Sequence, residues 1–222
     1  MFAELLPPDV EVAMYDPSMA HDVHCDELRL MASAVPRRRA EFAAGRACAR
    51  AALRRLGING WPLLVGSKRE PLWPAGVVGS ITHTDGLVAA AVSRRPPLAG
   101  FGIDAEQRRP LPAGVRETVC TPREIAWCLA HEPSIPWDTM IFSAKESIFK
   151  AWFPATVTWL GYLEVDVVLE PGDGGRGTFG VAELSSNVAV PSASSFIGAF
   201  AAAHEFVLTS AVLEHADTND AR

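Results

Sequence analysis

The sequence predicts an α+β fold made of two similar lobes. Three observations support it: each half of the chain has a predicted long helix, each half has a predicted β-hairpin, and the two hairpins share one order of features. In both hairpins, residues 79–92 and 196–213, a short glycine-containing strand and a tight turn precede an apolar strand. We interpret this repeat as the trace of an old duplication.

The composition is that of a globular protein. The chain has 222 residues, of which 49% are hydrophobic and 21% are charged, which is too apolar for disorder. No apolar run approaches the ~18 residues that a membrane span needs, and residues 1–8 do not resemble a secretory signal. The spacing of the four cysteines matches neither a zinc site nor a dense disulfide framework. We therefore expect a reducing, cytoplasmic environment.

Basic residues are concentrated in one part of an otherwise acidic chain. The formal net charge is −6, yet residues 36–69 hold nine of the twenty lysines and arginines and a single acid, Glu41. A protein of this charge is poorly suited to general nucleic-acid binding. The local basic segment is better suited to steering one compact anion into a site.

The basic segment begins with the first long helix. A strand near residues 10–14 and a short helix over 25–34 are expected before it. The long helix is predicted from Pro36 to about residue 56, because proline fits the first turn of a helix. Its arginines, among them Arg46 and Arg50 one turn apart, suit either a solvated face or an anion site.

Two carboxylates end a predicted strand at residues 98–106, which follows the hairpin. Asp104 and Glu106 are two residues apart, so on a strand their side chains point to the same face. Two adjacent carboxylates need a cation, or one of them must keep its proton. Paired oxygen ligands suit Mg²⁺, especially beside a substrate phosphate. A pair of solvated acids is the equally ordinary alternative.

A connector rich in proline and glycine follows, at residues 107–119. We place the lobe boundary at its start, which gives an N-terminal lobe of residues 1–106 and a C-terminal lobe of residues 107–222. Thr121 begins a capping box for a short helix. Asp138 is expected to cap the second long helix, which is predicted to end at residue 153.

Lys145 lies in the middle of the apolar face of that second helix. A lysine among core residues is costly unless it is paired, so we infer that an anion binds beside it. Glu146 and Lys150 follow on the same helix, and one turn apart they could form an ordinary ion pair. Strands are then expected at residues 163–169, 178–184, 196–203 and 206–213, with a polar loop at 185–195 and a frayed end at 215–222.

Several motifs in a fixed order resemble those of one enzyme family. They are Arg39-Ala40-Glu41-Phe42, Gly45-Arg46-Ala47-Cys48-Ala49-Arg50, Glu70-Pro71-Leu72-Trp73-Pro74, Gly79-Ser80-Ile81-Thr82-His83, Gly102-Ile103-Asp104-Ala105-Glu106 and Phe142-Ser143-Ala144-Lys145-Glu146-Ser147-Ile148-Phe149-Lys150-Ala151-Trp152. The ordered set, over residues 36–165, resembles the Sfp/EntD-type 4′-phosphopantetheinyl transferases. Val65 departs from the family pattern, in which a lysine is common there, and this departure concerns the nucleotide contact.

The resemblance implies two similar α/β lobes in a pseudo-twofold arrangement, with coenzyme A in the cleft between them. It implies transfer of the 4′-phosphopantetheine arm to a serine of a carrier protein, with Mg²⁺ or Mn²⁺ and with release of adenosine 3′,5′-bisphosphate. By motif, the metal ligands would be Asp104, Glu106 and Glu146, with Glu146 also acting as base and Lys150 assisting the leaving phosphate. The implied coenzyme A contacts are Arg38, Arg46, Lys68, Arg69, Glu70, Thr82, His83, Asp104, Lys145 and Lys150.

The implied partners are coenzyme A and apo carrier proteins or domains of fatty acid, polyketide or nonribosomal peptide synthases. We expect a monomer with no nucleic-acid or membrane partner, and a carrier surface around residues 107–128 that includes Trp127 and nearby arginines. Two other functions stay open: Mg²⁺-dependent hydrolysis of a nucleotide pyrophosphate, and non-catalytic binding of coenzyme A or a carrier. The crowding of three acids argues against a pure binding module.

Overall fold

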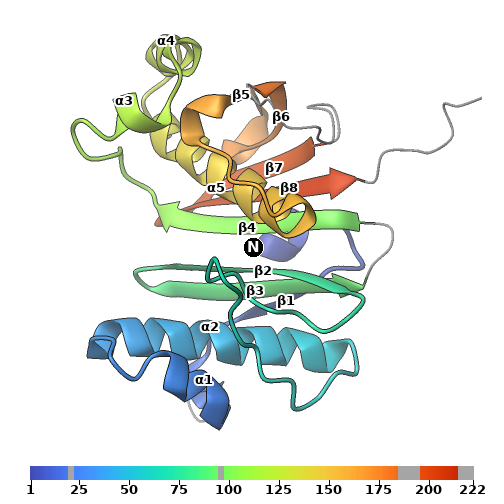
Figure 1. The fold of residues 1–222 in the computed structure, drawn as a ribbon. Coiled ribbons are helices and arrows are strands. Elements are labelled where there is room, and N and C mark those ends of the chain that lie inside the picture. The colour runs from blue at the N-terminus through green and yellow to red at the C-terminus, as the bar shows by residue number, and fades with distance from the viewer. Residues whose placement is uncertain (20–22, 95–97, 185–195, 215–222) are drawn as a thin grey trace, which may run out of the picture.

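A computed structural model of the chain describes residues 1–19, 23–94, 98–184 and 196–214. These residues form two antiparallel sheets between two long helices, so that the layers run helix, sheet, sheet, helix (Figure 1). The mixture of helices with antiparallel sheets confirms the predicted α+β class. The loop expected at 185–195 and the frayed end expected at 215–222 lie outside the described residues.

The helices and strands occupy the following positions. The helices are α1 (Cys25–Leu30), α2 (Pro36–Arg55), α3 (Arg116–Val119), α4 (Pro122–Ala130) and α5 (Trp137–Thr156), with short 3-10 helices η1 (Phe2–Glu4), η2 (Pro17–Met19), η3 (Tyr162–Glu164) and η4 (Asp173–Gly175). The strands are β1 (Glu11–Met14), β2 (Val77–Thr84), β3 (Leu87–Arg94), β4 (Leu98–Gln107), β5 (Val165–Pro171), β6 (Arg176–Leu184), β7 (Phe196–Ala203) and β8 (Phe206–Glu214).

The first sheet has the strand order β1-β3-β2 and is covered on one face by α2. Side chains alternate along β3 as the two-residue period of a strand requires. Ala90 and Val92 pack into the core beneath α2, whereas Ala89 and Ala91 pack into the core shared with the second sheet. The first sheet is therefore buried on both faces.

The second sheet has the order β4-β8-β7-β6-β5 and is covered by α5. Along β4, Phe101 and Ile103 face the first sheet and join its core. Gly100 and Gly102, which alternate with them along the strand, face α5. A Cβ on Gly102 would lie 1.9 Å from the Ser147 carbonyl oxygen, and one on Gly100 would lie 2.4 Å from a backbone oxygen of the same helix. Glycine is therefore required for α5 to approach β4 this closely.

The two sheets meet where β2 runs beside β4. The Ser80 hydroxyl accepts a hydrogen bond from the Ile103 backbone N–H at 3.0 Å, and the Thr82 hydroxyl accepts one from Ala105 at 3.0 Å. Strand β4 lies at the edge of its sheet. The two hydroxyls accept hydrogen bonds from its backbone N–H groups on the side where a further strand would otherwise pair. This contact brings the first sheet to the strand that carries the predicted acids.

Two expectations need correction. The N-cap residue of α5 is Pro136 and not Asp138, whose carboxylate instead accepts from the Thr139 and Leu111 backbone N–H groups. The helix also continues past Pro154 to Thr156, since the fixed φ of proline is itself close to the helical value. Strand β4, in which the predicted lobe boundary after residue 106 falls, is hydrogen-bonded through β8 to the second sheet.

Both hairpins, the long helix from Pro36 and the capping box at Thr121 are confirmed. The helix expected over 25–34 is shorter, since α1 ends at Leu30, and the predicted connector ends in α3. Among the helices of the described residues, none has the length and apolar character needed to cross a membrane.

Candidate active site

Asp104 lies at the centre of the site, on the face of β4 that points toward α5. Its side chain is 5% exposed and is held by three groups from two other elements. Lys150 Nζ lies 2.7 Å from Oδ1, the Ser143 hydroxyl donates to Oδ2 at 2.8 Å, and the Thr82 hydroxyl lies 3.3 Å from Oδ1. A buried carboxylate with this many donors keeps one orientation.

Glu106 projects from the same face of β4 and carries an unusual proton affinity. Burial, together with the neighbouring Asp104 carboxylate, raises the pKa of Glu106 to about 7, and Glu146 contributes in the same direction. Asp104 and Glu146 are therefore close enough to repel a charge on Glu106, and this repulsion exceeds the attraction that Lys150 exerts on it. A bound cation would remove this repulsion.

The donor chemistry of these three acids suits Mg²⁺, which prefers carboxylate oxygens and shares its shell with phosphate and water. The side chains do not form a closed cage. Within the part of the chain that the structure describes, the one group of three ligating residues whose atoms all lie within 4.8 Å of one another is His24, Cys25 and Asp26. Asp104, Glu106 and Glu146 are not such a group, so their ligand atoms do not all lie within 4.8 Å of one another in this structure.

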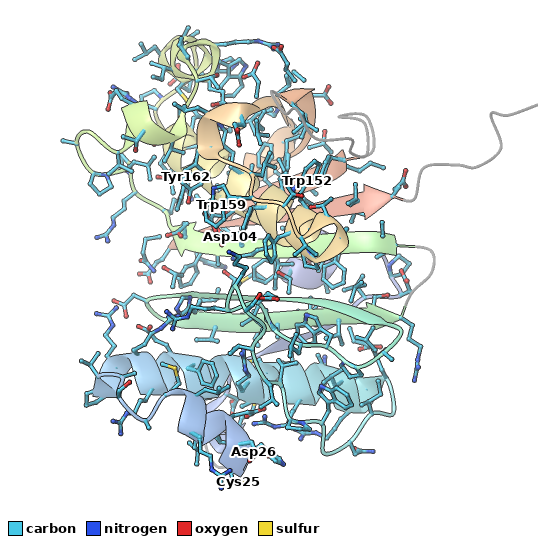
Figure 2. All side chains as sticks on the ribbon, viewed as in Figure 1. Cys25, Asp26, Asp104, Trp152, Trp159 and Tyr162 are labelled. Atoms are coloured by element: carbon cyan, nitrogen blue, oxygen red, sulfur yellow. The ribbon has the colours of Figure 1, made fainter. Side chains whose placement is uncertain are left out.

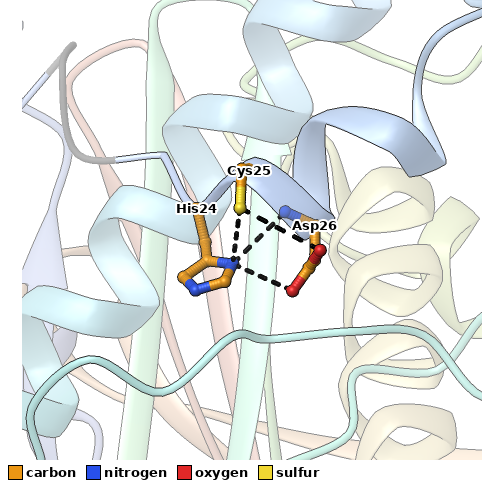
Figure 3. A group of neighbouring side chains, drawn as sticks. All are labelled: His24, Cys25 and Asp26. Atoms are coloured by element: carbon orange, nitrogen blue, oxygen red, sulfur yellow. Dashed lines mark hydrogen bonds and ion pairs between the residues drawn. The ribbon is translucent and has the colours of Figure 1, made fainter.

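The His24, Cys25 and Asp26 group has a structural explanation (Figure 3). His24 Nδ1 accepts a hydrogen bond from the Asp26 backbone N–H at 3.2 Å, and the Glu27 side chain accepts one from the His24 backbone, so the group forms the capping box of α1. In Figure 2 the labelled Cys25 and Asp26 lie at the far end of the molecule from Asp104. They do not belong to the predicted site.

Lys145 lines the same small cavity as Glu146, but its ammonium is buried and bonded to protein groups, which disagrees with the predicted contact with a phosphate. Its ammonium donates to Glu124 Oε2 at 2.7 Å, to the Val119 carbonyl at 2.9 Å and to the Tyr162 carbonyl at 2.8 Å. An ammonium has three protons, so these partners use all of them. The anion expected beside Lys145 is therefore the carboxylate of Glu124, and both side chains are 1% exposed.

A basic cavity of about 280 Å³ lies between α2 and β2, lined among others by Arg38, Arg46, Arg69 and His83. Arg46 is buried, donates from Nε to the Leu63 carbonyl at 2.9 Å, and stacks 4.3 Å from the Phe42 ring centre. Burial lowers its pKa to about 10, so it stays charged near neutral pH. Burial and then Arg38 lower the pKa of His83, whose Nε2 lies 2.5 Å from Arg38 Nη1. His83 is thus neutral at pH 7.

Further cavities continue from the basic one. A cavity of about 230 Å³ shares Arg69 and Ile81 with it and reaches Lys68, Glu70 and Lys150. One of about 460 Å³ shares His83 with it and reaches Glu106 and, among the connector residues, Gln107 and Arg109. The cavity that Glu106 lines therefore extends to the connector, and it adjoins the basic cavity beside α2.

Most of the predicted site residues are brought together. Besides Lys145, nine of them line one or more of four cavities: Arg38, Arg46, Lys68, Arg69, Glu70, His83, Glu106, Glu146 and Lys150. Thr82 and Asp104 are buried and are hydrogen-bonded to each other. Glu70 also holds its own loop, because its carboxylate accepts from the Lys68 backbone N–H at 2.9 Å. Val65, the departure from the family pattern, lines the basic cavity.

Two residues of the site were missed. Ser143 stands three residues before Glu146 and seven before Lys150, and this spacing on one helix face could have identified it. Tyr162 donates a hydrogen bond from its hydroxyl to Glu146 Oε1. It lies in η3, outside any periodic pattern, so no local signal in the sequence identified it.

A cleft that joins basic cavities to a cluster of acids is typical of enzymes that act on phosphate esters. Comparison with known proteins is more specific. Residues 26–93 match the family model of the 4′-phosphopantetheinyl transferase N-terminal domain, and residues 100–203 match that of the 4′-phosphopantetheinyl transferase superfamily.

Three curated relatives extend this match. The chain is 37% identical over 223 residues to the 4′-phosphopantetheinyl transferase Npt of Nocardia iowensis, covering 95% of this chain and 98% of Npt. It is 39% identical over 192 residues to PptT of Mycobacterium tuberculosis, covering 85% of each. It is 48% identical over 152 residues to Svp of Streptomyces mobaraensis, covering 67% of this chain and 62% of Svp. The chain therefore belongs to the 4′-phosphopantetheinyl transferase family, which confirms the resemblance.

Proposed function

We propose that this chain transfers the 4′-phosphopantetheine arm of coenzyme A to a serine of an apo carrier protein or domain. The serine oxygen forms a bond to the phosphorus that bears the pantetheine, and the bond from that phosphorus to the bridging pyrophosphate oxygen breaks. Adenosine 3′,5′-bisphosphate leaves, and the serine proton goes to a base. The observation that carries the proposal is that the basic cavity adjoins two others: it shares His83 with the cavity that Glu106 of β4 lines, and Arg69 with the cavity that Lys150 of α5 lines.

Asp104, Glu106 and Glu146 would hold Mg²⁺, or Mn²⁺ in its place, which when bound supplies positive charge to the coenzyme A pyrophosphate. Glu146 takes the proton of the carrier serine, since a hydroxyl is a weak nucleophile and a nearby carboxylate can accept its proton during attack. Lys150 is 25% exposed and lines the same cavity as Lys68. This exposure and location support a role for Lys150 in assisting the leaving phosphate.

The nucleotide end of coenzyme A binds in the basic cavity. Arg46 has five N–H donors and uses Nε for the Leu63 carbonyl, so its other donors can contact a phosphate. The side chains of Arg38, Lys68 and Arg69 supply further positive charge near the 3′-phosphate and adenine end of coenzyme A. Glu70 holds the loop that carries Lys68 and Arg69. Thr82 and His83 contact the pyrophosphate from β2.

The carrier docks on residues 107–128, which comprise the connector and most of α4. The cavity that reaches Glu106 is lined there by Arg109, Pro110, Leu111, Pro112 and Val115, which offer a basic group and an apolar surface. Trp127 stacks on His131 at 3.6 Å, and Leu129 of the same helix is 73% exposed. We also propose a cytoplasmic monomer without nucleic-acid or membrane partners, which the net charge of −6 and the free cysteines support.

Incubation with coenzyme A, MgCl₂ and a panel of apo carriers tests the proposal, with intact-mass measurement of the carrier as readout. We expect the carrier to gain one phosphopantetheine and an equal amount of adenosine 3′,5′-bisphosphate to form, and EDTA to stop both. Cleavage of coenzyme A without carrier modification would instead indicate a hydrolase. Binding of coenzyme A with no product would indicate a binding module.

A further inference from the structure

Tyr162 is tied to α5 at both of its ends. Its backbone carbonyl accepts a hydrogen bond from Lys145 Nζ at 2.8 Å, and its hydroxyl donates to Glu146 Oε1. Between these ends its ring packs against Phe142, with ring centres 5.7 Å apart. Tyr162 thus contacts two consecutive residues of the helix and lies beside a third.

The carbonyl end is anchored to a rigid part of the fold. Lys145 is paired with Glu124, whose carboxylate also accepts from the Thr121 backbone N–H at 2.7 Å and from Val167 at 2.8 Å. The ion pair therefore joins α5 to the start of α4 and to β5, with both charged groups almost fully buried. A buried pair with every donor used holds its position closely.

The local backbone then sets the direction of the Tyr162 ring. Gly161 precedes η3, and its N–H donates to the Glu164 carboxylate at 2.6 Å. The ring lines a cavity of about 180 Å³ together with Glu146, Phe149 and Trp159. In Figure 2, Tyr162, Trp159 and Asp104 all lie in the upper layer, toward the level where the sheets face each other.

The hydroxyl is a donor and not an acceptor. A phenol is protonated near neutral pH, and the Tyr162 hydroxyl lies against Glu146 Oε1, to which it donates. A glutamate side chain has several rotatable bonds and gains order when one of its oxygens is held. A donor on Oε1 leaves the lone pairs of Oε2 available to other partners.

We propose that Tyr162 is a positioning residue for Glu146: its hydroxyl, anchored through the Lys145–Glu124 pair, holds one carboxylate oxygen so that the other faces the reacting groups. This inference rests on the proposed function, in which Glu146 is both base and metal ligand. Small errors in the placement of a catalytic group cost rate much more than they cost substrate binding.

The test compares Tyr162→Phe with wild type and with Tyr15→Phe. Tyr15 is the other tyrosine of the chain, and its exposed fraction of 37% equals that of Tyr162, but it lies beside β3, where its N–H bonds to Val88. For Tyr162→Phe we expect kcat for carrier modification to fall roughly tenfold to hundredfold, with KM for coenzyme A within about twofold. Binding of Mn²⁺ in the presence of coenzyme A, measured by electron paramagnetic resonance without carrier, should weaken several-fold.

A third variant, Tyr162→Leu, separates positioning from packing, because it removes the ring as well as the hydroxyl. If only Tyr162→Leu lost activity while Tyr162→Phe matched wild type in kcat and in Mn²⁺ binding, Tyr162 would be a packing residue and the inference would be overturned. A loss shared equally by Tyr162→Phe and Tyr15→Phe would overturn it too. Failure of wild type itself to modify any carrier would count against the proposed function instead.

Discussion

Lys150 Nζ lies 2.7 Å from Asp104 Oδ1, which joins the last turns of α5 to the middle of β4 across 46 residues of sequence. The contact depends on how closely the helix approaches the strand, since Gly100 and Gly102 face α5 where any side chain would collide with it. The same approach brings Ser143 to the other oxygen of Asp104. The geometry of the acids thus depends on the glycines before them.

Replacement of Gly102 by alanine should disrupt this contact. The new Cβ would lie 1.9 Å from the Ser147 carbonyl oxygen, which is backbone and cannot move alone. We expect the free energy of unfolding to fall by about 3 kcal/mol or more, or the variant to be insoluble. Gly180→Ala on β6 is the matched control, because nothing lies within 4 Å of its Cβ position. Denaturant unfolding of both variants checks this, and equal stabilities would contradict it.

Glu146→Gln should abolish transfer and leave the fold intact. The amide cannot accept the serine proton and is a poor Mg²⁺ ligand, although it can still accept a hydrogen bond from Tyr162. We expect kcat to fall by at least 10²-fold, with a melting temperature within a few degrees of wild type. Steady-state kinetics and thermal unfolding measure the two. Near-normal turnover would show that the base and metal assignments are wrong.

Arg46→Ala should weaken coenzyme A binding and also lower stability. The change removes positive charge from the basic cavity, and it removes the bond to the Leu63 carbonyl and the stacking on Phe42. We expect a KM for coenzyme A raised at least tenfold and a loss of about 1–2 kcal/mol in the free energy of unfolding. Arg29→Ala is the control, since the Arg29 side chain is 81% exposed on α1. An unchanged KM would return Arg46 to a purely structural role.

Lys145 and Lys68 should behave in opposite ways. Lys145→Met leaves the Glu124 carboxylate buried without its ammonium partner, and burial already raises the pKa of Glu124. We expect a loss of about 3 kcal/mol in stability with KM for coenzyme A within twofold. Lys68→Met, in an exposed loop beside the cavity, should raise KM and leave stability unchanged. Steady-state kinetics and thermal unfolding distinguish the two patterns. A large rise in KM for Lys145→Met would support the contact between Lys145 and a phosphate.

Without divalent ions, the contribution of Glu106 to stability should fall as the pH rises. The folded state holds the Glu106 proton up to a pKa of about 7, whereas the unfolded state releases it near the ordinary value of 4.5. Between these values the folded state binds more protons, so the stability contribution of Glu106 is present below about pH 4.5 and is lost by about pH 7.

The variant Glu106→Gln isolates this effect, because other groups titrate equally in both proteins. In EDTA, the stability of Glu106→Gln relative to wild type should rise by roughly 2 kcal/mol between pH 4.5 and pH 8. MgCl₂ should stabilise wild type more at pH 8 than at pH 4.5. Denaturant unfolding at both pH values measures these differences, and a constant difference between the two proteins would contradict the pKa assigned to Glu106.

Local features of the sequence predicted most elements and many of the site residues. The helix beginning at Pro36, the hairpin at 77–93 and the shared face of Asp104 and Glu106 follow from capping, turn chemistry and the period of a strand, each of which acts over a few residues. The motif that contains Glu146 and Lys150 indicated the family. A cap at Asp138 was predicted wrongly because its carboxylate binds the Leu111 N–H, a distant partner that no local pattern records.

By itself, then, the sequence determined the order of the elements, the acids and arginines available for chemistry, and the family to which they belong. Tertiary structure decided that β4 joins the second sheet, that Glu124 takes the charge of Lys145, and that Tyr162 reaches Glu146. The physical reason is one of range. Helix and strand periods depend on neighbours along the chain, whereas ion pairs and hydrogen bonds between buried groups depend on packing that brings distant segments within about 3 Å.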